Sequence, residues 1–242
     1  MIIDRNKRFI FIHIPRTGGS TLSGLLTHLN DEEYSSLVAR NYKQYFDTKH
    51  RDVHNNHHSH ATMDWFPKTK PSDYNDYSEI FCFVRNPWDR FRSVYLNMLN
   101  AQLNQIHMYG SDHALHHHGE TLAVSTTLST FGNFINTVYK ENRSHRSRYS
   151  DFQIHEIVSQ PQSHWYNHPA ITHVYRFENY EENVKAILEK YSFTETWKST
   201  VPHVNKGIVK YEYTYDLTYT SEMLEKVAYI ETDTIKKFGY NF

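Results

Sequence analysis

One short segment near the start of the chain restricts the fold more than any other. Residues 8–14 form an apolar run of β-branched and aromatic side chains, which is typical of a buried strand. Pro15 ends this run, and a turn that contains Gly18 and Gly19 follows. Leucines then recur at helical spacing, at Leu22, Leu25, Leu26 and Leu29. The segment therefore predicts a strand, a glycine-containing loop and a helix in direct succession.

The same order of elements occurs twice more along the chain. Residues 79–84 predict a second strand and residues 88–103 a helix, while residues 172–177 predict a third strand and residues 178–191 another helix. No linker and no abrupt change of composition interrupts the sequence. Strands that alternate with helices predict an α/β fold, with a central, mainly parallel sheet flanked by helices. We expect one domain over residues 1–242.

The rest of the chain divides into further helices and polar stretches. Apolar periodicity predicts helices over residues 31–46, 131–139 and 220–238. The polar, histidine-rich or proline-containing stretches predict loops, mainly over residues 50–76, 142–169 and 201–207, and residues 105–127 show no clear pattern.

The first loop has the composition of a phosphate-binding turn. Its glycines allow the backbone to approach a ligand, and the helix that follows offers free amides and a partial positive charge. Arg16, Thr17, Ser20 and Thr21 add side-chain donors. The nucleotide-triphosphatase pattern Gly-x4-Gly-Lys-Ser/Thr is absent. Because ligands of parallel sheets bind beyond the carboxyl ends of the strands, this loop is expected at a binding site.

A second basic segment follows the second strand. Arg85 closes the strand, and Ser93 lies about two helical turns further on. A cation and a hydroxyl in this arrangement predict a second phosphate contact. Asp89 and Arg90, in contrast, have the pattern of a salt-bridged helix start, in which they pair with each other or with neighbours.

Together the two segments resemble the sulfotransferase superfamily that uses 3′-phosphoadenosine-5′-phosphosulfate, PAPS. Residues 14–21 look like its 5′-phosphosulfate loop, and residues 83–95 look like its 3′-phosphate motif. The most similar branch is the carbohydrate type, which includes heparan and chondroitin sulfotransferases and bacterial relatives. Residues 175–179, 202–206 and 238–240 also fit that branch. The resemblance implies a P-loop-like sulfotransferase fold.

The resemblance also implies a set of donor-binding residues. The 5′-phosphosulfate would be held by the first loop, through Arg16, Thr17, Gly18, Gly19, Ser20 and Thr21. The 3′-phosphate would be held by Arg85 and Ser93. Phe177 stands where relatives place an aromatic ring near the adenine, and Asn205 and Lys206 match a late loop that folds over the nucleotide.

Arg16 is a departure from the family pattern, because lysine is usual at this position. In the family this cation neutralises the bridging oxygen as the sulfuryl group leaves. Arginine carries the same charge on a planar fork, so the resemblance implies the same catalytic role with a different geometry.

Transfer to a hydroxyl needs a base, and histidine is suited to this near neutral pH. Three histidines, His57, His58 and His60, precede Ala61. The resemblance implies a catalytic histidine or glutamate at this stage of the chain, before the second phosphate motif. We predict His60 as the base, with His58 as the alternative.

The resulting hypothesis is a PAPS-dependent O-sulfotransferase that releases adenosine 3′,5′-bisphosphate. The resemblance favours a carbohydrate acceptor, while a small alcohol, a phenol and a protein tyrosine stay open. The alternatives are a nucleotide kinase-like phosphotransferase and a non-catalytic module that binds a nucleotide or a glycan. The absent triphosphatase lysine argues against the first, and the candidate base argues against the second.

Composition narrows the partners and the location. The net charge of -1 gives no bulk electrostatic reason to bind nucleic acid or an anionic membrane. No stretch approaches the roughly 18 apolar residues of a membrane-spanning helix. Cys82, the single cysteine, lies in an apolar run and is expected to be buried. We therefore expect a soluble cytoplasmic protein.

The histidine clusters raise the question of a metal. The candidate ligands are His57, His58 and His60, and further along the chain His113, His116, His117 and His118. The sequence contains no accompanying cysteine pair and no His-Glu-x-x-His pattern. We predict no metal.

Overall fold

The computed structural model describes residues 2–4, 8–27, 60, 62–63, 76–99, 129–144, 160–193 and 216–242. The chain divides into two compact units. The sheet unit comprises Met1–Arg85 and Gln162–Lys206, and the helical unit comprises Asn86–Pro161 and Gly207–Phe242. Each unit is described by itself below. The prediction of a single domain over residues 1–242 stays a prediction.

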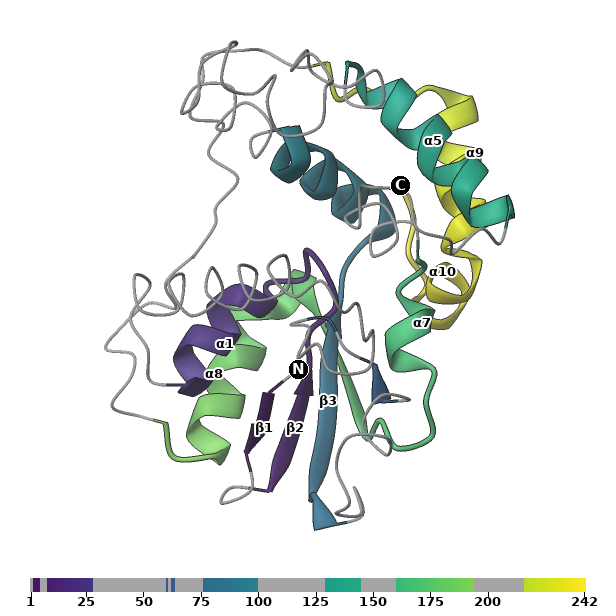
Figure 1. The fold of residues 1–242 in the computed structure, drawn as a ribbon. Coiled ribbons are helices and arrows are strands. Elements are labelled where there is room, and N and C mark those ends of the chain that lie inside the picture. Colours follow the sequence, from purple (N-terminus) through teal and green to yellow (C-terminus); the bar gives the residue numbers. More distant parts are fainter. Residues whose placement is uncertain are drawn as a thin grey trace, which may run out of the picture. The chain divides into compact units, whose positions relative to one another are not determined.

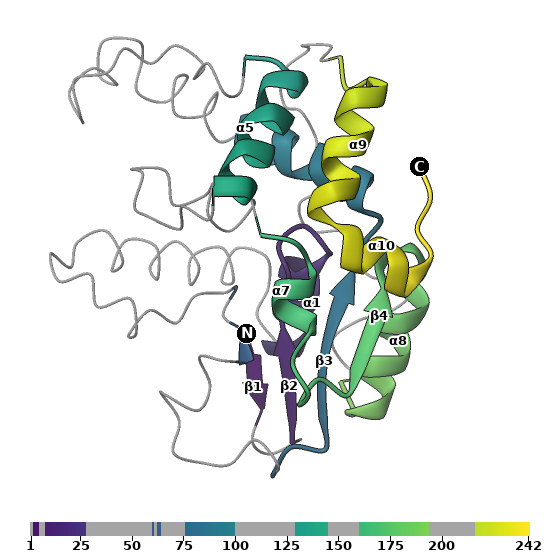
Figure 2. The same ribbon diagram turned by 90° about the vertical axis from the view of Figure 1, so that its right-hand side faces the viewer.

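A four-stranded sheet forms the centre of the sheet unit (Figure 1). Its strands are β1 (Ile2–Asp4), β2 (Phe9–Ile12), β3 (Glu79–Val84) and β4 (His173–Arg176), in that order across the sheet. The pairs β2–β3 and β3–β4 are parallel, and Figure 2 shows the arrows of β3 and β4 side by side. β1 pairs antiparallel with β2. The expected α/β fold with a mainly parallel sheet is confirmed.

Aromatic side chains of the sheet meet two helices on one face. Phenylalanines from β2 and β3 form one cluster with leucines of α1 (Gly19–Thr27) and with aliphatic residues of α8 (Tyr180–Lys190). The strand side chains of this cluster are Phe9, Phe11, Phe81 and Phe83. Both helices lie beside the sheet in Figure 1. The cluster fixes where α1 begins, and therefore where the loop before it lies.

The three predicted strands and their helices agree with the structure. β3 covers residues 79–84 as predicted, and Cys82 is buried in it. The helix predicted over residues 178–191 starts as a short 3₁₀ turn, η5 (Phe177–Asn179), and continues as α8. β1 was not predicted. The stretch over residues 142–169, predicted to be mostly loop, contains one further short helix, α7 (Ser163–Tyr166).

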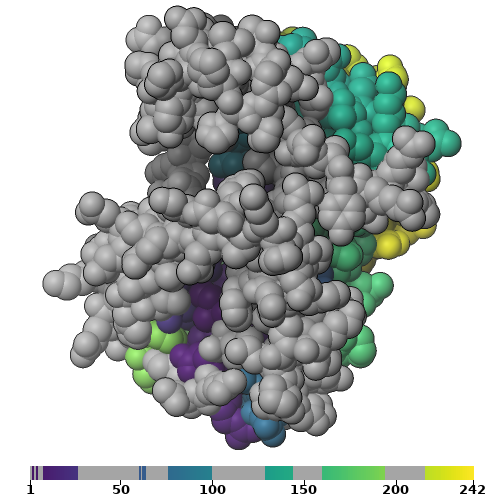
Figure 3. Space-filling view, in the orientation of Figure 1, coloured from purple at the N-terminus to yellow at the C-terminus, as the bar shows by residue number. Residues whose placement is uncertain are grey.

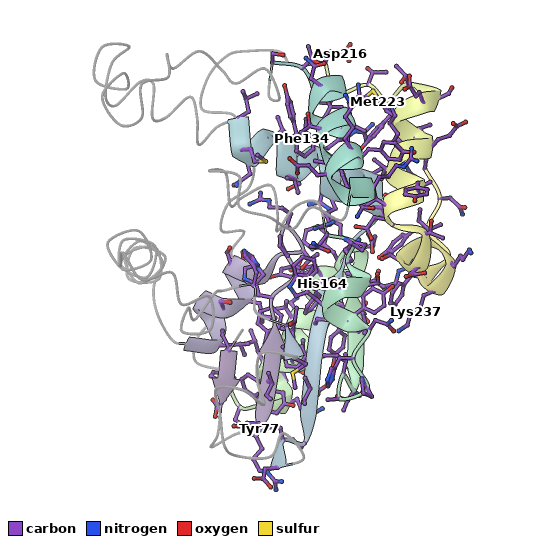
Figure 4. All side chains as sticks on the ribbon, turned by 45° about the vertical axis from the view of Figure 1, so that its right-hand side comes forward. Tyr77, Phe134, His164, Asp216, Met223 and Lys237 are labelled. Atoms are coloured by element: carbon purple, nitrogen blue, oxygen red, sulfur yellow. The ribbon has the colours of Figure 1, made fainter. Side chains whose placement is uncertain are left out.

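The helical unit has an aromatic core of its own. A helix over residues 87–99 begins after Asn86, whose side-chain oxygen accepts hydrogen bonds from the main-chain N–H groups of Trp88 and Asp89. The helices α5 (Phe131–Ser144) and α9 (Ser221–Ile230) pack together, and α5 reaches the surface in Figure 3. Figure 4 labels Phe134 and Met223, two buried side chains of α5 and α9.

The prediction of one helix over residues 220–238 is wrong in one respect, because the structure has two helices there. α9 ends at Ile230, and α10 (Thr232–Phe238) begins after Glu231. Glu231 is fully buried and accepts a 2.7 Å hydrogen bond from Arg90 and another, also 2.7 Å, from the hydroxyl of Thr234. This carboxylate therefore occupies the junction of the two helices. Arg90 pairs with it rather than with Asp89, which contacts Arg92.

Several predictions fall on residues outside the described ranges. They include the helix over residues 31–46 and the stretches over residues 105–127 and 201–207. Among the described residues, no helix has both the length and the apolar character needed to cross a membrane.

Candidate functional site

The loop between β2 and α1 has an unusual backbone. Arg16 and Gly18 both have positive φ angles, 66° and 84°. A side-chain carbon at Gly18 would lie 2.4 Å from the ring of Tyr180, and one at Gly19 would lie 1.8 Å from the ring of His13. Both positions therefore need glycine, for the turn and for the rings that pack against it. Tyr180 also donates a 2.6 Å hydrogen bond to the carbonyl oxygen of Gly18.

The hydroxyl side chains of this loop differ in their surroundings. Thr17 is fully buried, and its hydroxyl donates to the carbonyl oxygen of Ile14 at 2.9 Å. Thr21 is also buried, whereas Ser20 is partly exposed. Thr17 therefore stabilises the turn through its side chain, and Ser20 is the hydroxyl that lies closest to solvent. The main-chain N–H groups at the start of α1 have no carbonyl partner within the helix and are suited to an anion.

Two arginines meet at this loop. Nη1 of Arg85, which directly follows β3, donates a 3.4 Å hydrogen bond to the main-chain oxygen of Arg16. Burial, and then the positive charge of Arg85, lower the pKa of Arg16 to about 10. Both side chains stay protonated at neutral pH, so the structure concentrates positive charge beside the loop.

Phe177 lies under one of these arginines. The guanidinium carbon of Arg85 is 4.5 Å from the centre of the Phe177 ring, a cation–π contact. The same ring packs 5.1 Å from Tyr180. Phe177 therefore belongs to the same cluster as Arg85 and the loop. The prediction that its ring contacts an adenine stays a prediction.

His60 reaches the same part of the sheet unit through His13. Nδ1 of His60 lies 2.9 Å from the carbonyl oxygen of His13, and the centres of the two rings are 4.4 Å apart. Burial, and then the neighbouring His60, hold the pKa of His13 well below its usual value, so the His13 ring is neutral near pH 7. The His13 ring in turn packs against Gly19 of the loop. The structure thus connects the predicted base to the loop between β2 and α1.

Two residues of this region were not predicted from the sequence. Gln162 bonds both main-chain groups of Arg85: its Oε1 accepts from the N–H at 2.9 Å, and its Nε2 donates to the carbonyl oxygen at 2.9 Å. The indole N–H of Trp165, on α7, donates to the carbonyl oxygen of His60 at 2.8 Å. Figure 4 marks α7 by its label on His164. Both residues lie in a stretch that was predicted to be mostly loop.

The remaining predicted site residues belong to the helical unit or lie outside the described residues. Ser93 is partly buried on the helix over residues 87–99, in the helical unit. His58, Asn205 and Lys206 lie outside the described residues. Within the described ranges, no group of three or more histidine, cysteine, aspartate or glutamate side chains could hold a metal ion.

Comparison with known proteins gives one match. A family model described as "Sulfotransferase family" matches residues 1–238, nearly the whole chain. No curated protein and no solved structure matches.

Proposed function

This chain belongs to the sulfotransferase family, and we propose that it moves a sulfuryl group from PAPS to a hydroxyl group of an acceptor. The observation that carries the proposal is the pair of arginines beside the glycine loop. Arg85 contacts the main chain of Arg16, and its charge helps to lower the pKa of Arg16. A phosphate or sulfate group is attracted by two cations beside one loop, and it offsets the repulsion between them. A donor that carries phosphate and sulfate groups would supply such an anion.

The donor would bind along the loop. In the proposal, the N–H groups of residues 18–21 and the hydroxyl of Ser20 bind the 5′-phosphosulfate, and Arg85 binds the 3′-phosphate. Phe177, Asn205 and Lys206 would contact the rest of the nucleotide. These three roles, and that of Ser93 at the 3′-phosphate, rest on the sequence resemblance.

The reaction would be an in-line displacement at sulfur. The acceptor oxygen forms a bond to sulfur while the bond from sulfur to the 5′-phosphate oxygen breaks. The electron pair of the broken bond stays on adenosine 3′,5′-bisphosphate, and the acceptor proton goes to His60. Arg16 and the loop amides would stabilise the charge on the departing oxygen.

The position of His60 supports its role as the base. Because a carbonyl oxygen can only accept, the contact with His13 places a hydrogen on Nδ1 of His60. Nε2 is then the nitrogen that can take a proton from the acceptor. His58 stays the alternative. We propose a carbohydrate as the acceptor, on the sequence resemblance to the carbohydrate-type branch.

A transfer assay with labelled donor tests the proposal. Sulfur-labelled PAPS is incubated with the protein and a panel of sugars, phenols and alcohols, and both labelled acceptor and bisphosphate are quantified. We expect the two products in equal amounts. Donor binding with neither product would instead indicate a non-catalytic module, and phosphoryl transfer from ATP would indicate a kinase-like enzyme.

A binding measurement tests the donor site independently of the acceptor. Arg85→Ala is expected to weaken binding of the bisphosphate by about 10- to 150-fold, because a hydrogen bond to a charged group is lost. Ser93→Ala should weaken it less. Arg8→Ala is the matched control, since Arg8 also donates to a main-chain oxygen, that of Asp76, but precedes β2 at the opposite end of the strand. Wild-type affinity in Arg85→Ala, with folding intact, would contradict the assignment.

A further inference from the structure

One short segment of the sheet unit contacts both the proposed donor ligand Arg85 and the proposed base. Gln162 is 0% exposed and Trp165 is 2% exposed. Gln162 bonds the main chain of Arg85 through both ends of its amide, and Trp165 bonds the main chain of His60. These contacts join parts of the chain that are 77 and 105 residues apart in sequence.

The amide of Gln162 is not required by its own helix. Gln162 occupies the position before α7, where a polar side chain commonly caps the first turn, yet its side chain makes no capping hydrogen bond. The strand ladder ends one residue before Arg85, with the pair Val84–Arg176. Gln162 therefore supplies, from a side chain, the donor and the acceptor that a neighbouring strand would offer if the ladder continued.

We propose that Gln162 and Trp165 are positioning residues of the transfer reaction. Gln162 fixes the main chain of Arg85 and so directs its guanidinium to the 3′-phosphate of the donor. Trp165 fixes the main chain of His60 and so places the base beside the acceptor. This inference rests on the proposed function, because it takes Arg85 as a ligand and His60 as the base. Small displacements of either group would be costly, since catalysis depends on near-attack geometry.

The affinities for two nucleotides distinguish a positioning role of Gln162 from a merely structural one. Adenosine 3′,5′-bisphosphate carries the phosphate that Arg85 would bind, and adenosine 5′-phosphate lacks it. Gln162→Leu keeps the volume but removes both hydrogen bonds. We expect it to weaken binding of the bisphosphate by about 5- to 150-fold, the scale of an unsatisfied buried polar group, and to change binding of the monophosphate less than twofold. If Gln162→Leu does not fold, Gln162→Glu, which keeps the acceptor and loses the donor, is measured in the same way.

Trp165→Phe tests the other contact, because it keeps an aromatic ring and removes the N–H group. We expect the imidazole ¹⁵N signals of His60, identified by their loss in His60→Ala, to shift in this variant. Turnover with the acceptor found in the panel should fall about tenfold or more, while affinity for the bisphosphate stays at the wild-type value. Substitution of Gln162 would thus change the affinity for the bisphosphate, whereas substitution of Trp165 would change the turnover.

Thr172→Val is the matched control. The hydroxyl of Thr172 bonds both main-chain groups of Ile80, at 3.0 Å each, near the start of β3, just as Gln162 bonds Arg85 beyond its end. We expect this variant to lose stability without a change in either nucleotide affinity or in the His60 signals.

These measurements test the role of Gln162, the role of Trp165 and the proposed function separately. Wild-type binding of both nucleotides in the Gln162 variant, or an equal loss of both, would overturn the role of Gln162. Unchanged His60 signals in Trp165→Phe would overturn the role of Trp165. If the wild-type protein binds neither nucleotide, the proposed function fails instead, and the inference fails with it.

Discussion

Gly19 makes the sharpest single-residue test of the loop. A side-chain carbon there would lie 1.8 Å from Cδ2 in the ring of His13, which is buried. The main-chain carbonyl oxygen of His13 in turn contacts His60. Gly19→Ala therefore has to displace His13. We expect a loss of about 1–3 kcal/mol in the free energy of unfolding, as for other overpacked sites, measured by urea denaturation.

A second glycine provides the control for this substitution. Gly132 lies in α5, and among the described residues outside the backbone of α5 the atoms nearest to a side-chain carbon there would be Sδ of Met223 and Oγ1 of Thr130, both at 3.9 Å. Gly132→Ala is expected to stabilise the protein by about 0.4–1 kcal/mol, because alanine restricts the unfolded chain. Equal effects of the two substitutions would show that the His13 contact does not constrain the loop.

The base can be located by alanine substitutions in the histidine cluster. His60→Ala should lower turnover by about 10²- to 10⁴-fold, the usual contribution of general base catalysis. Its affinity for the bisphosphate should barely change, because Arg85 and the loop hold the nucleotide. His57→Ala should have little effect on either quantity.

A large loss of turnover in His58→Ala alone would instead move the role by two residues. Near-normal turnover in all three variants would exclude the cluster as the source of the base. His13 would then be the next residue to test, because its neutral ring lies beside that of His60.

At the scale of elements, a buried carboxylate joins the sheet to α8. Glu79, the first residue of β3, accepts hydrogen bonds from Lys190 at 2.6 Å, from Tyr175 at 3.0 Å and from Tyr191. Burial alone would raise the pKa of Glu79, but the hydrogen bonds from Lys190, Tyr191 and Tyr175 outweigh it and hold the pKa below its usual value. The carboxylate is therefore favoured in the folded state.

Glu79→Gln should reduce the free energy of unfolding by about 1–3 kcal/mol at pH 7, because a charged acceptor is lost. The sign of the pH effect follows from the lowered pKa. The stabilisation is complete above the unfolded-state pKa, near 4.5, and is lost as the pH falls through the lower folded-state pKa.

Urea denaturation between pH 3 and pH 7 should therefore show a steeper acid loss in the wild type than in Glu79→Gln. Glu222→Gln serves as the control, because the Glu222 carboxylate is exposed and its ion pair with Lys226 lies within α9. Parallel pH profiles of wild type and Glu79→Gln would contradict the role of Glu79.

The elements could be predicted where the pattern is local. β3 and α8 follow from apolar runs and helical spacing, and the structure has them at Glu79–Val84 and Tyr180–Lys190. β1 has only three residues, too few for a periodic pattern, and it forms because its partner β2 is available. The carboxylate at the junction of α9 and α10 binds Arg90, 141 residues away in sequence, and local spacing does not predict that contact.

At the scale of the whole molecule, the residues of the site also divide into those that a local pattern predicts and those that depend on contacts distant in sequence. Arg85 directly follows β3, and Arg16, Gly18 and Gly19 lie between the end of β2 and the first residue of α1, so the rule for parallel sheets places them together. Gln162 and Trp165 act on residues far away in sequence, through side chains that bond main-chain atoms. Their residue types alone do not distinguish them from ordinary loop residues. Only the folded sheet unit shows what they contact.

Transfer is expected to continue after exhaustive chelation. In the proposed reaction, Arg16 and the loop amides stabilise the charge on the departing oxygen, so no step requires a metal ion. The assay is release of bisphosphate from PAPS before and after treatment with a chelator. Loss of release that zinc specifically restores would revive the histidine clusters as metal ligands.

The division of the chain into two units has a consequence for protein synthesis. Each unit combines an early and a late segment, so neither can be completed while the chain is still short. The sheet unit gains β4 only after Arg176 has been made, and Arg90 gains its partner only with Glu231. Within the helical unit, the buried side chains Phe91 and Tyr95 gain their ring contacts with Phe131 and Phe134 only once α5 has been made. Apolar surface that is exposed during synthesis is prone to aggregation, and slowing the ribosome before α5 is made would lengthen that exposure.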